Sequence, residues 1–158
     1  MLTIPMRRIA SPQGRIPDAL PHPATAGAAG ADLCANIDTA WTVPPMGRVV
    51  VPTGIAMQLP DAGYAAFVFA RSGLGIKHGL TLSNGVGVID SDYRGEICVG
   101  LVNLSDTAYT VEPGERIAQL CIMPVMAFAP VETETLSNTA RGTGGFGSTG
   151  RGAEQEKA

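Results

Sequence analysis

The chain has 158 residues, a length that suffices for one domain with a core and is too short for two comfortable ones. Hydrophobic residues make up 45% of it, so we expect it to fold. Its formal net charge is −3 at pH 7, which excludes a duplex nucleic-acid binder with a basic face and is compatible with a small anionic ligand. Only 16% of the residues are charged, against roughly 25% in an average domain, so we expect partner subunits to bury part of the surface.

The cysteines and the apolar runs bear on the compartment. Cys34, Cys98 and Cys121 are odd in number and lack metal-ligand spacing, so they are expected to be reduced thiols. The first eight residues contain no apolar segment of the kind found in secretory signals. No apolar run approaches the roughly 20 residues needed to span a membrane. We therefore expect a cytoplasmic protein without a membrane partner.

Short β-type runs follow one another along the chain, separated by turns rich in the 20 glycines and 12 prolines. Short strands at this spacing predict an all-β sandwich or barrel. The run 64–70 is apolar on both faces and predicts a central strand, whereas 72–78 predicts one helical turn at most. The expected strands are 2–9, 48–51, 55–59, 64–70, 86–89, 96–103, 107–111 and 116–125.

The composition changes at Glu132, where the chain becomes polar and then rich in glycine. We expect a β domain at 1–131 and a flexible linker with a glycine-rich lid at 132–158. The glycine spacing of this lid fits G-x-G-x-x-G, but a dinucleotide loop needs a strand before it and a helix after it. Its Arg141 and Phe146 are instead suited to closing over a phosphate and a flat ring.

The densest polar cluster runs over 84–96, and its β-type flanks and turn-like centre predict a hairpin. Asp90 follows the apolar pair Val88-Ile89, which could hold its carboxylate against a packed wall, where it can accept a proton from water. On a regular strand, Asp90 and Asp92 would share a face. Taken by itself, the segment also fits a turn whose aspartates bond their own backbone, and local chemistry favours that alternative.

Two further segments carry charge beside glycine. Arg71 ends the apolar run 64–70 and can grip phosphate with two hydrogen bonds, and Ser72 and the N–H of Gly73 can add donors. Asp32, the sole acid among small residues, could hold the hydration shell of Mg²⁺. The alternatives are an exposed turn for Arg71 and a turn cap for Asp32.

The segment 114–120 offers Arg116 and Gln119 as the residues that could face a ligand, with a strand of one polar edge as the alternative. The combination is more informative than each piece. Arg71, Arg116 and Arg141 stand in three separate glycine-bearing segments, as a triphosphate clamp requires.

With these residues in place, the chain resembles the trimeric dUTPase family. Five segments of that family occur in its order, and they are 24–35, 71–79, 84–103, 114–120 and 141–150. The most specific are Val-Ile-Asp-Ser-Asp-Tyr-Arg-Gly at 88–95 and Gly-Gly-Phe-Gly-Ser-Thr at 144–149. The first segment often carries Ser where this chain has Ala28, a change that removes a hydroxyl and leaves Asp32.

The resemblance implies a jelly-roll-like distorted β-barrel, a homotrimer with shared active sites, and Mg²⁺-assisted hydrolysis of dUTP to dUMP and pyrophosphate. Such an enzyme keeps uracil out of DNA and supplies dUMP for thymidylate synthesis. By the resemblance, Asp90 activates the attacking water and Asp32 contacts the metal through water. The implied substrate-binding residues are Asn84, Gly87, Val88, Ile89, Asp90 and the backbone near Cys98 for uracil, Tyr93 for deoxyribose, Arg71, Ser72, Gly73 and Gln119 for phosphate and water, and Arg141, Phe146, Gly147 and Ser148 from the lid.

Two other functions stay open at this point. A dCTP deaminase, a relative with a similar β trimer, would need a carboxylic acid beside C4 of the pyrimidine. A non-catalytic deoxynucleotide binder would lack Asp90 or the lid arginine, and both Asp90 and Arg141 are present.

Overall fold

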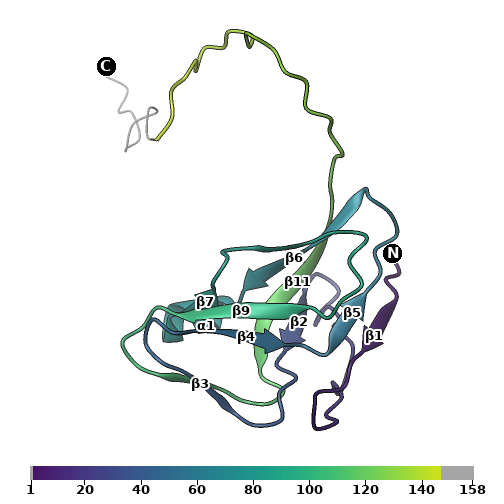
Figure 1. Ribbon diagram of the computed structural model, residues 1–158, viewed down its shortest axis with the longest axis vertical. Helices are drawn as coiled ribbons and strands as arrows, with labels where there is room; N and C mark the ends of the chain where they lie inside the picture. The colour runs from purple at the N-terminus through teal and green to yellow at the C-terminus, as the bar shows by residue number, and fades with distance from the viewer. Residues whose placement is uncertain (1, 147–158) are drawn as a thin grey trace. The chain divides into compact units, whose positions relative to one another are not determined.

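The computed structural model describes residues 2–146. The chain divides into two units, Met1–Ala127 and Phe128–Ala158, whereas the sequence predicted a division between 131 and 132. The described residues form strands and one short helix, which confirms the all-β prediction (Figure 1). The elements are β1 (Met6–Arg8), β2 (Ala31–Cys34), β3 (Trp41–Val43), β4 (Arg48–Pro52), β5 (Ile55–Met57), β6 (Tyr64–Ala70), α1 (Ser72–His78), β7 (Leu80–Leu82), β8 (Gly87–Ile89), β9 (Cys98–Asn103), β10 (Tyr109–Val111) and β11 (Arg116–Pro124).

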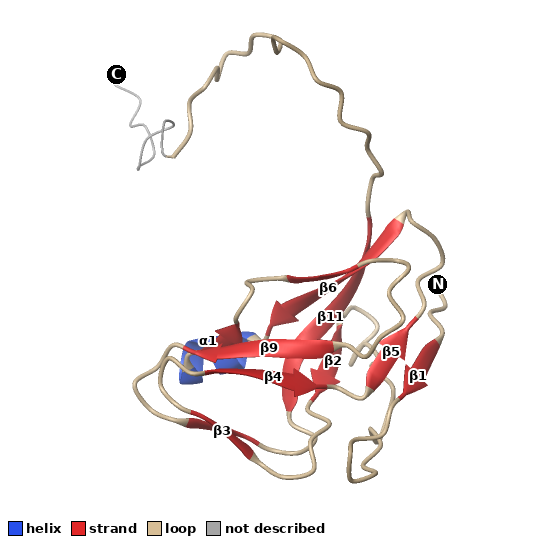
Figure 2. Cartoon of the chain, viewed as in Figure 1, coloured by secondary structure: helices blue, strands red, loops and turns tan. Residues whose placement is uncertain are grey.

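Two antiparallel sheets contribute most of the first unit (Figure 2). One has the strand order β2-β11-β6-β8 and the other β4-β9-β7, while β1 pairs with β5 and β10 with β3. Strand β6 is hydrogen-bonded on both sides, to β11 and to β8, so the predicted central strand is confirmed. A register shift between Arg116 and Ala118 interrupts the pairing of β11 with β2.

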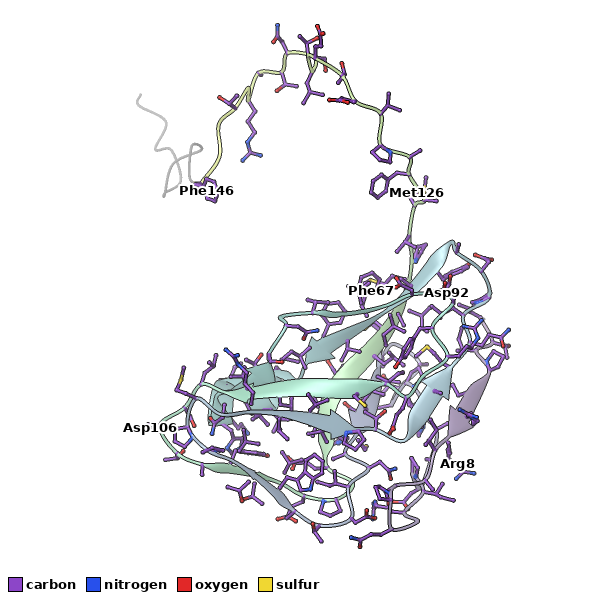
Figure 3. All side chains as sticks on the ribbon, viewed as in Figure 1. Arg8, Phe67, Asp92, Asp106, Met126 and Phe146 are labelled. Atoms are coloured by element: carbon purple, nitrogen blue, oxygen red, sulfur yellow. The ribbon has the colours of Figure 1, made fainter. Side chains whose placement is uncertain are left out.

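The core lies where the inward faces of these sheets meet. Leu33 of β2, Val51 of β4, Val99 of β9 and Ile117 of β11 are at most 1% exposed and belong to one apolar cluster. Side chains along each strand point alternately toward this core and away from it. Side chains fill the space between the strands throughout this unit (Figure 3).

The structure departs from the sequence prediction in short elements. Helix α1 has seven residues, about two turns rather than one at most, and ends at Gly79, whose φ of 66° suits glycine. Strands β2, β3 and β7 were not predicted, and only Met6–Arg8 of the expected strand 2–9 is paired. The sequence of β2, Ala-Asp-Leu-Cys, has no β-branched residue, so its pairing with β11 decides its conformation. The one helix of the described residues is too short to cross a membrane.

Candidate active site

A cavity of about 310 Å³ lies between two stretches of chain, 84–90 and 96–100, which we call its two arms. The sequence predicted a hairpin here, and that prediction is wrong. Strand β8 pairs with β6 of one sheet and β9 pairs with β4 and β7 of the other, so the segment crosses between sheets. Among the described residues, the backbones of the two arms make no hydrogen bond to each other. Each arm is hydrogen-bonded to its own sheet, β8 to β6 and β9 to β4, and the space between the arms is not closed by a backbone ladder.

The floor of the cavity is apolar and closely packed. Val68 and Leu82 line it and are each 4% exposed. Gly87 lies so close to Val68 that an added Cβ would stand 3.0 Å from the Cβ of Val68, with Asn84 next nearest. Only glycine fits this contact without displacing its neighbour. The result is a narrow slot with an apolar floor and polar backbone edges, a shape suited to a flat heterocycle.

Tyr93 forms part of the rim and is held in a defined position. Its hydroxyl donates a hydrogen bond of 2.9 Å to the carbonyl of Glu96. A Cβ added to Gly95 would stand only 2.3 Å from that hydroxyl, so Gly95 leaves the space that the ring occupies. The ring remains 46% exposed and can contact a ligand bound in the cavity.

Asp90 also lines the cavity, but not in the way its neighbours in sequence suggested. Strand β8 ends at Ile89, and Asp90 begins a turn closed by a hydrogen bond from the N–H of Tyr93 to its carbonyl. Asp90 and Asp92 therefore do not share a face of one regular strand. The expected packed wall is only partly formed: Ile89 packs against the core, whereas Val88 is 62% exposed and Asp90 itself is exposed. Its carboxylate is open to solvent at the mouth of the cavity.

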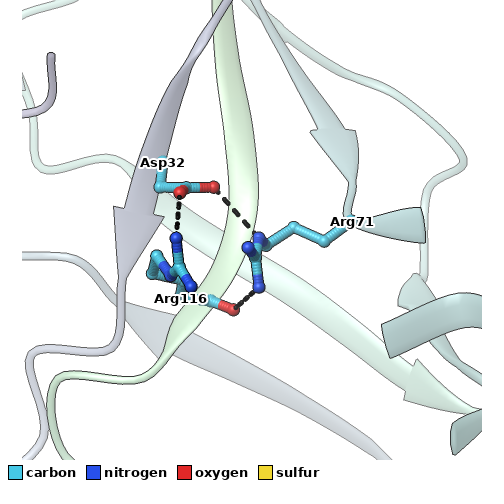
Figure 4. Close-up of polar contacts among 3 residues, drawn as sticks. All are labelled: Asp32, Arg71 and Arg116. Carbon is cyan, nitrogen blue, oxygen red and sulfur yellow. Dashed lines mark hydrogen bonds and ion pairs between the residues drawn. The ribbon is translucent and has the colours of Figure 1, made fainter. Parts of the chain in front are cut away.

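A second group of polar residues gathers where β2, β6 and β11 meet, and we call Asp32, Arg71 and Arg116 the arginine cluster (Figure 4). Arg71 Nε donates to Asp32 Oδ1 at 3.0 Å, and an Arg116 guanidinium N–H donates to Asp32 Oδ2 at 3.2 Å. Arg71 also donates to the carbonyl of Arg116 at 3.2 Å. One carboxylate thus holds two cations together, and each guanidinium keeps further N–H groups for an anion.

The other predicted phosphate-binding residues lie beside this cluster. Gln119 of β11 is directly opposite Asp32 of β2 in the antiparallel register, so the two side chains leave the same face of the sheet. Ser72 and Gly73 follow Arg71 at the start of α1 and are exposed. A Cβ added to Gly73 would meet nothing within 4 Å, so packing within this chain does not require glycine there.

The cavity and the arginine cluster are chemically complementary. The charged residues that line the cavity are Asp90 and Glu96, and within the described part of the chain no Lys or Arg lines it. The cavity can therefore take a ring and a sugar, while a triphosphate needs the cations of an arginine cluster. The sequence had not singled out Val68 or Glu96, because an apolar residue in a buried strand and an acid after a turn carry no distinctive signal.

The lid residues belong to the second compact unit. Arg141 Nε donates to the carbonyl of Gly144 at 3.2 Å within that unit. Phe146 is fully exposed and has a φ of 46°, an unusual value for a residue with a side chain (Figure 3). Gly147 and Ser148, also expected to bind substrate, lie outside the described residues.

The donor set bears on how Mg²⁺ could be held. Within residues 2–146, no three His, Cys, Asp or Glu side chains gather as a metal cage would require. Both oxygens of Asp32 already accept hydrogen bonds from arginines. These residues fit a Mg²⁺ that takes its ligands from substrate phosphates and water, with a carboxylate close by.

Two thiols flank these sites and are kept protonated. Desolvation of the sulfur, followed by the charge of Asp32, raises the pKa of Cys34, which stands in β2 beside the arginine cluster. Desolvation and then the charge of Glu96 raise the pKa of Cys98 at the cavity. Neither thiol is activated as a nucleophile at neutral pH, because only the thiolate is reactive.

Comparison with known proteins agrees with this geometry. A family model described as dUTPase matches residues 17–150. The chain belongs to the dUTPase family. The deoxyuridine 5'-triphosphate nucleotidohydrolase of Desulfitobacterium hafniense is 54% identical over 131 residues, which are 83% of this chain and 87% of that protein. The protein of the same description from Thiobacillus denitrificans is 53% identical over 137 residues, which are 87% of this chain and 94% of that protein.

Solved structures of the dUTPase family share the fold. The dUTPase of Staphylococcus bacteriophage 80alpha, solved with dUPNHPP, superposes with a TM-score of 0.82 over 96% of this chain and 100% of that chain, at 26% identity. A structure of its G164S variant with dUpNHpp also has a TM-score of 0.82, at 24% identity. The predicted dUTPase-like β fold is thereby confirmed.

Proposed function

We propose that this chain hydrolyses dUTP to dUMP and pyrophosphate, and that it does so by attack of a water activated by Asp90. The observation that carries the proposal is the cavity between the two arms in a member of the dUTPase family. It offers a ring-sized slot with polar backbone edges and a carboxylate at its mouth. The family membership sets the reaction, and the cavity supports the assignment of residues to it.

Uracil recognition follows from the narrowness of the slot. Asn84 and the backbone of 87–90 and of Cys98 supply donors and acceptors along one ring edge. The contact between Gly87 and Val68 leaves little room to widen the floor, so a 5-methyl group, as in thymine, is excluded by size. Tyr93 lies against the deoxyribose and leaves no place for a 2′-hydroxyl.

The triphosphate is bound by the arginine cluster together with Ser72, Gly73 and Gln119. Among the described residues, Asp32 is the only carboxylate paired with Arg71 and Arg116, so their remaining N–H groups can donate to a negatively charged ligand in place of water. Asp32 keeps the two guanidinium groups close before the substrate arrives. This preorganisation reduces the cost of assembling two like charges on binding.

Asp90 takes the proton of the attacking water. An exposed carboxylate at the mouth of the cavity can accept the proton of a bound water, as a general base does. The water attacks the α-phosphorus in line, and pyrophosphate leaves. When bound, Mg²⁺ spreads the charge that develops on the phosphate oxygens. Asp32 is the residue that would contact its hydration shell.

A homotrimer accounts for the separation of cavity and cations. The outer face of the sheet β2-β11-β6-β8 carries Phe67 and Phe69, whose rings stack at 6.4 Å, and Val88 opposite Phe67. Gln119 lies opposite Phe69 in the same register, so this apolar strip adjoins the arginine cluster. A second copy packed on this face would bring its own cavity toward the cations of the first. The site would then be complete only in the assembly.

The lid closes the site in this proposal. Arg141 contacts the γ-phosphate and Phe146 stacks on uracil, with Gly147 and Ser148 adding donors. The enzyme acts in the cytoplasm, where its reaction keeps uracil out of DNA and supplies dUMP for thymidylate synthesis.

The test compares wild type, Asp90→Asn and Asp92→Asn for pyrophosphate release from dUTP, dTTP, dCTP and UTP with Mg²⁺. We expect turnover of dUTP alone, a loss of about 10²–10⁴-fold in Asp90→Asn with binding retained, and near-normal turnover in Asp92→Asn. Ammonia release from dCTP would instead indicate a deaminase. Equal turnover of dUTP and dTTP, or full turnover by Asp90→Asn, would contradict the proposal.

A further inference from the structure

The two arginines of the cluster stand on different elements, and a separate group of residues ties those elements together. Arg71 precedes α1, whereas Arg116 begins β11 after the turn 112–115. Tyr109 of β10 contacts the turn before Arg116 and the helix after Arg71. Its hydroxyl donates a hydrogen bond to Glu115 Oε1, and its ring lies 5.1 Å from that of His78, the last residue of α1.

Glu115 connects Tyr109 to the arginine cluster through further hydrogen bonds. Its Oε2 accepts from the N–H of Glu112 at 3.0 Å, which closes the turn, and its carbonyl accepts from the N–H of Ala35 just after β2. The next residue is Arg116, whose carbonyl accepts the hydrogen bond from Arg71. The position of Glu115 therefore fixes the position of the Arg116 backbone, and through the Arg116 carbonyl it fixes the position of the Arg71 side chain.

We propose that Tyr109 is a positioning residue for triphosphate binding, which fixes the spacing of Arg71 and Arg116 through Glu115 on one side and His78 on the other. The inference rests on the proposed function, because it assumes that the two arginines bind phosphate. Tyr109 itself touches no substrate. Its removal loosens the phosphate half of the site and leaves the uracil cavity intact, since none of Tyr109, Glu115 and His78 lines that cavity.

Burial supports the strength of the central hydrogen bond. Desolvation, followed by the hydrogen bond to Glu115 and its charge, raises the pKa of Tyr109 to about 12, while Arg71 lowers it. The phenol therefore stays a donor over the whole working range of pH. A hydrogen bond to a charged acceptor is about twice as strong as one between neutral groups.

The experiment uses full-length Tyr109→Phe, Glu115→Gln and the double variant, with Tyr64→Phe as matched control. Tyr64 lies at the far end of β6 from Arg71, and within the described residues its hydroxyl makes no hydrogen bond. Calorimetry measures binding of a non-hydrolysable imido analogue of dUTP and, separately, of deoxyuridine. Steady-state kinetics with dUTP gives KM and kcat, and thermal unfolding reports the fold.

We expect Tyr109→Phe to weaken binding of the analogue by about 3- to 10-fold and to leave binding of deoxyuridine unchanged. KM for dUTP should rise more than kcat falls, and the double variant should be no worse than the poorer single variant, because both break one hydrogen bond. Equal weakening of both ligands, or no weakening of the analogue, would overturn the inference. If Tyr109→Phe unfolds, Glu115→Gln alone decides by the same comparison. A wild type that neither binds nor hydrolyses dUTP would instead refute the proposed function.

Discussion

Asp32 is the residue whose replacement tests the arginine cluster most directly. Asp32→Asn keeps the size of the side chain and removes its charge. The Asp32 and Arg71 side chains are only 21% and 25% exposed, so their 3.0 Å pair is partly shielded from water, whereas Arg116 is 59% exposed. Hydrogen bonds to charged groups contribute about 1.5–3 kcal/mol, and exposed ion pairs about 0.2–1 kcal/mol.

From these exposures we expect Asp32→Asn to lower the free energy of unfolding by about 2 kcal/mol, Arg71→Gln by about 1.5 kcal/mol and Arg116→Gln by about 0.5 kcal/mol. The part due to Arg116 should shrink at high salt, because exposed pairs are screened. Urea unfolding at one fixed protein concentration measures the series, since association would otherwise shift the midpoints.

The control is Asp106→Asn, an exposed acid with no ion pair among the described residues, which should change stability by less than about 0.5 kcal/mol. A free energy of unfolding for Asp32→Asn no lower than that of this control would contradict a stabilising role for the cluster. A larger loss of stability in Arg116→Gln than in Arg71→Gln would also contradict it, because the more exposed pair should contribute less.

Three further outcomes are expected. Gly95→Ala should displace the Tyr93 ring, since its Cβ would stand 2.3 Å from the hydroxyl, and should raise turnover of UTP relative to dUTP, measured by pyrophosphate release. Deleting 141–158 should leave the circular dichroism and urea midpoint unchanged while kcat/KM falls, because the core lies in the first unit; a lower midpoint would show that the lid is structural. The pKa of Tyr109 is raised from 10 to about 12, so the stabilisation by its hydroxyl is complete below pH 10 and is lost between pH 10 and 12. The urea midpoint of Tyr109→Phe should therefore fall less than that of the wild type over this range.

The sequence by itself determined the fold class, the core strand and the chemistry-bearing residues. The apolar run 64–70 forms β6, which is hydrogen-bonded on both edges; Ala66 and Val68 on its inner face are buried, while Phe67 and Phe69 on its outer face are half-buried. Gly87 lies three residues before Asp90 and Arg71 directly precedes Ser72, and these local combinations are why those residues could be named in advance. The family signature at 88–95 combined these local features into one function.

Only the tertiary structure decided which groups meet. Strand β2 forms because β11 offers it a partner, and no residue within Ala-Asp-Leu-Cys predicts that pairing. Asp32, Arg71 and Arg116 are far apart along the chain, and the contacts among them arise from the register of β2 on β11 and the end of β6. The expected hairpin opened into a cavity for the same reason. Its arms belong to different sheets, whose non-local hydrogen bonds outweigh the local preference to pair.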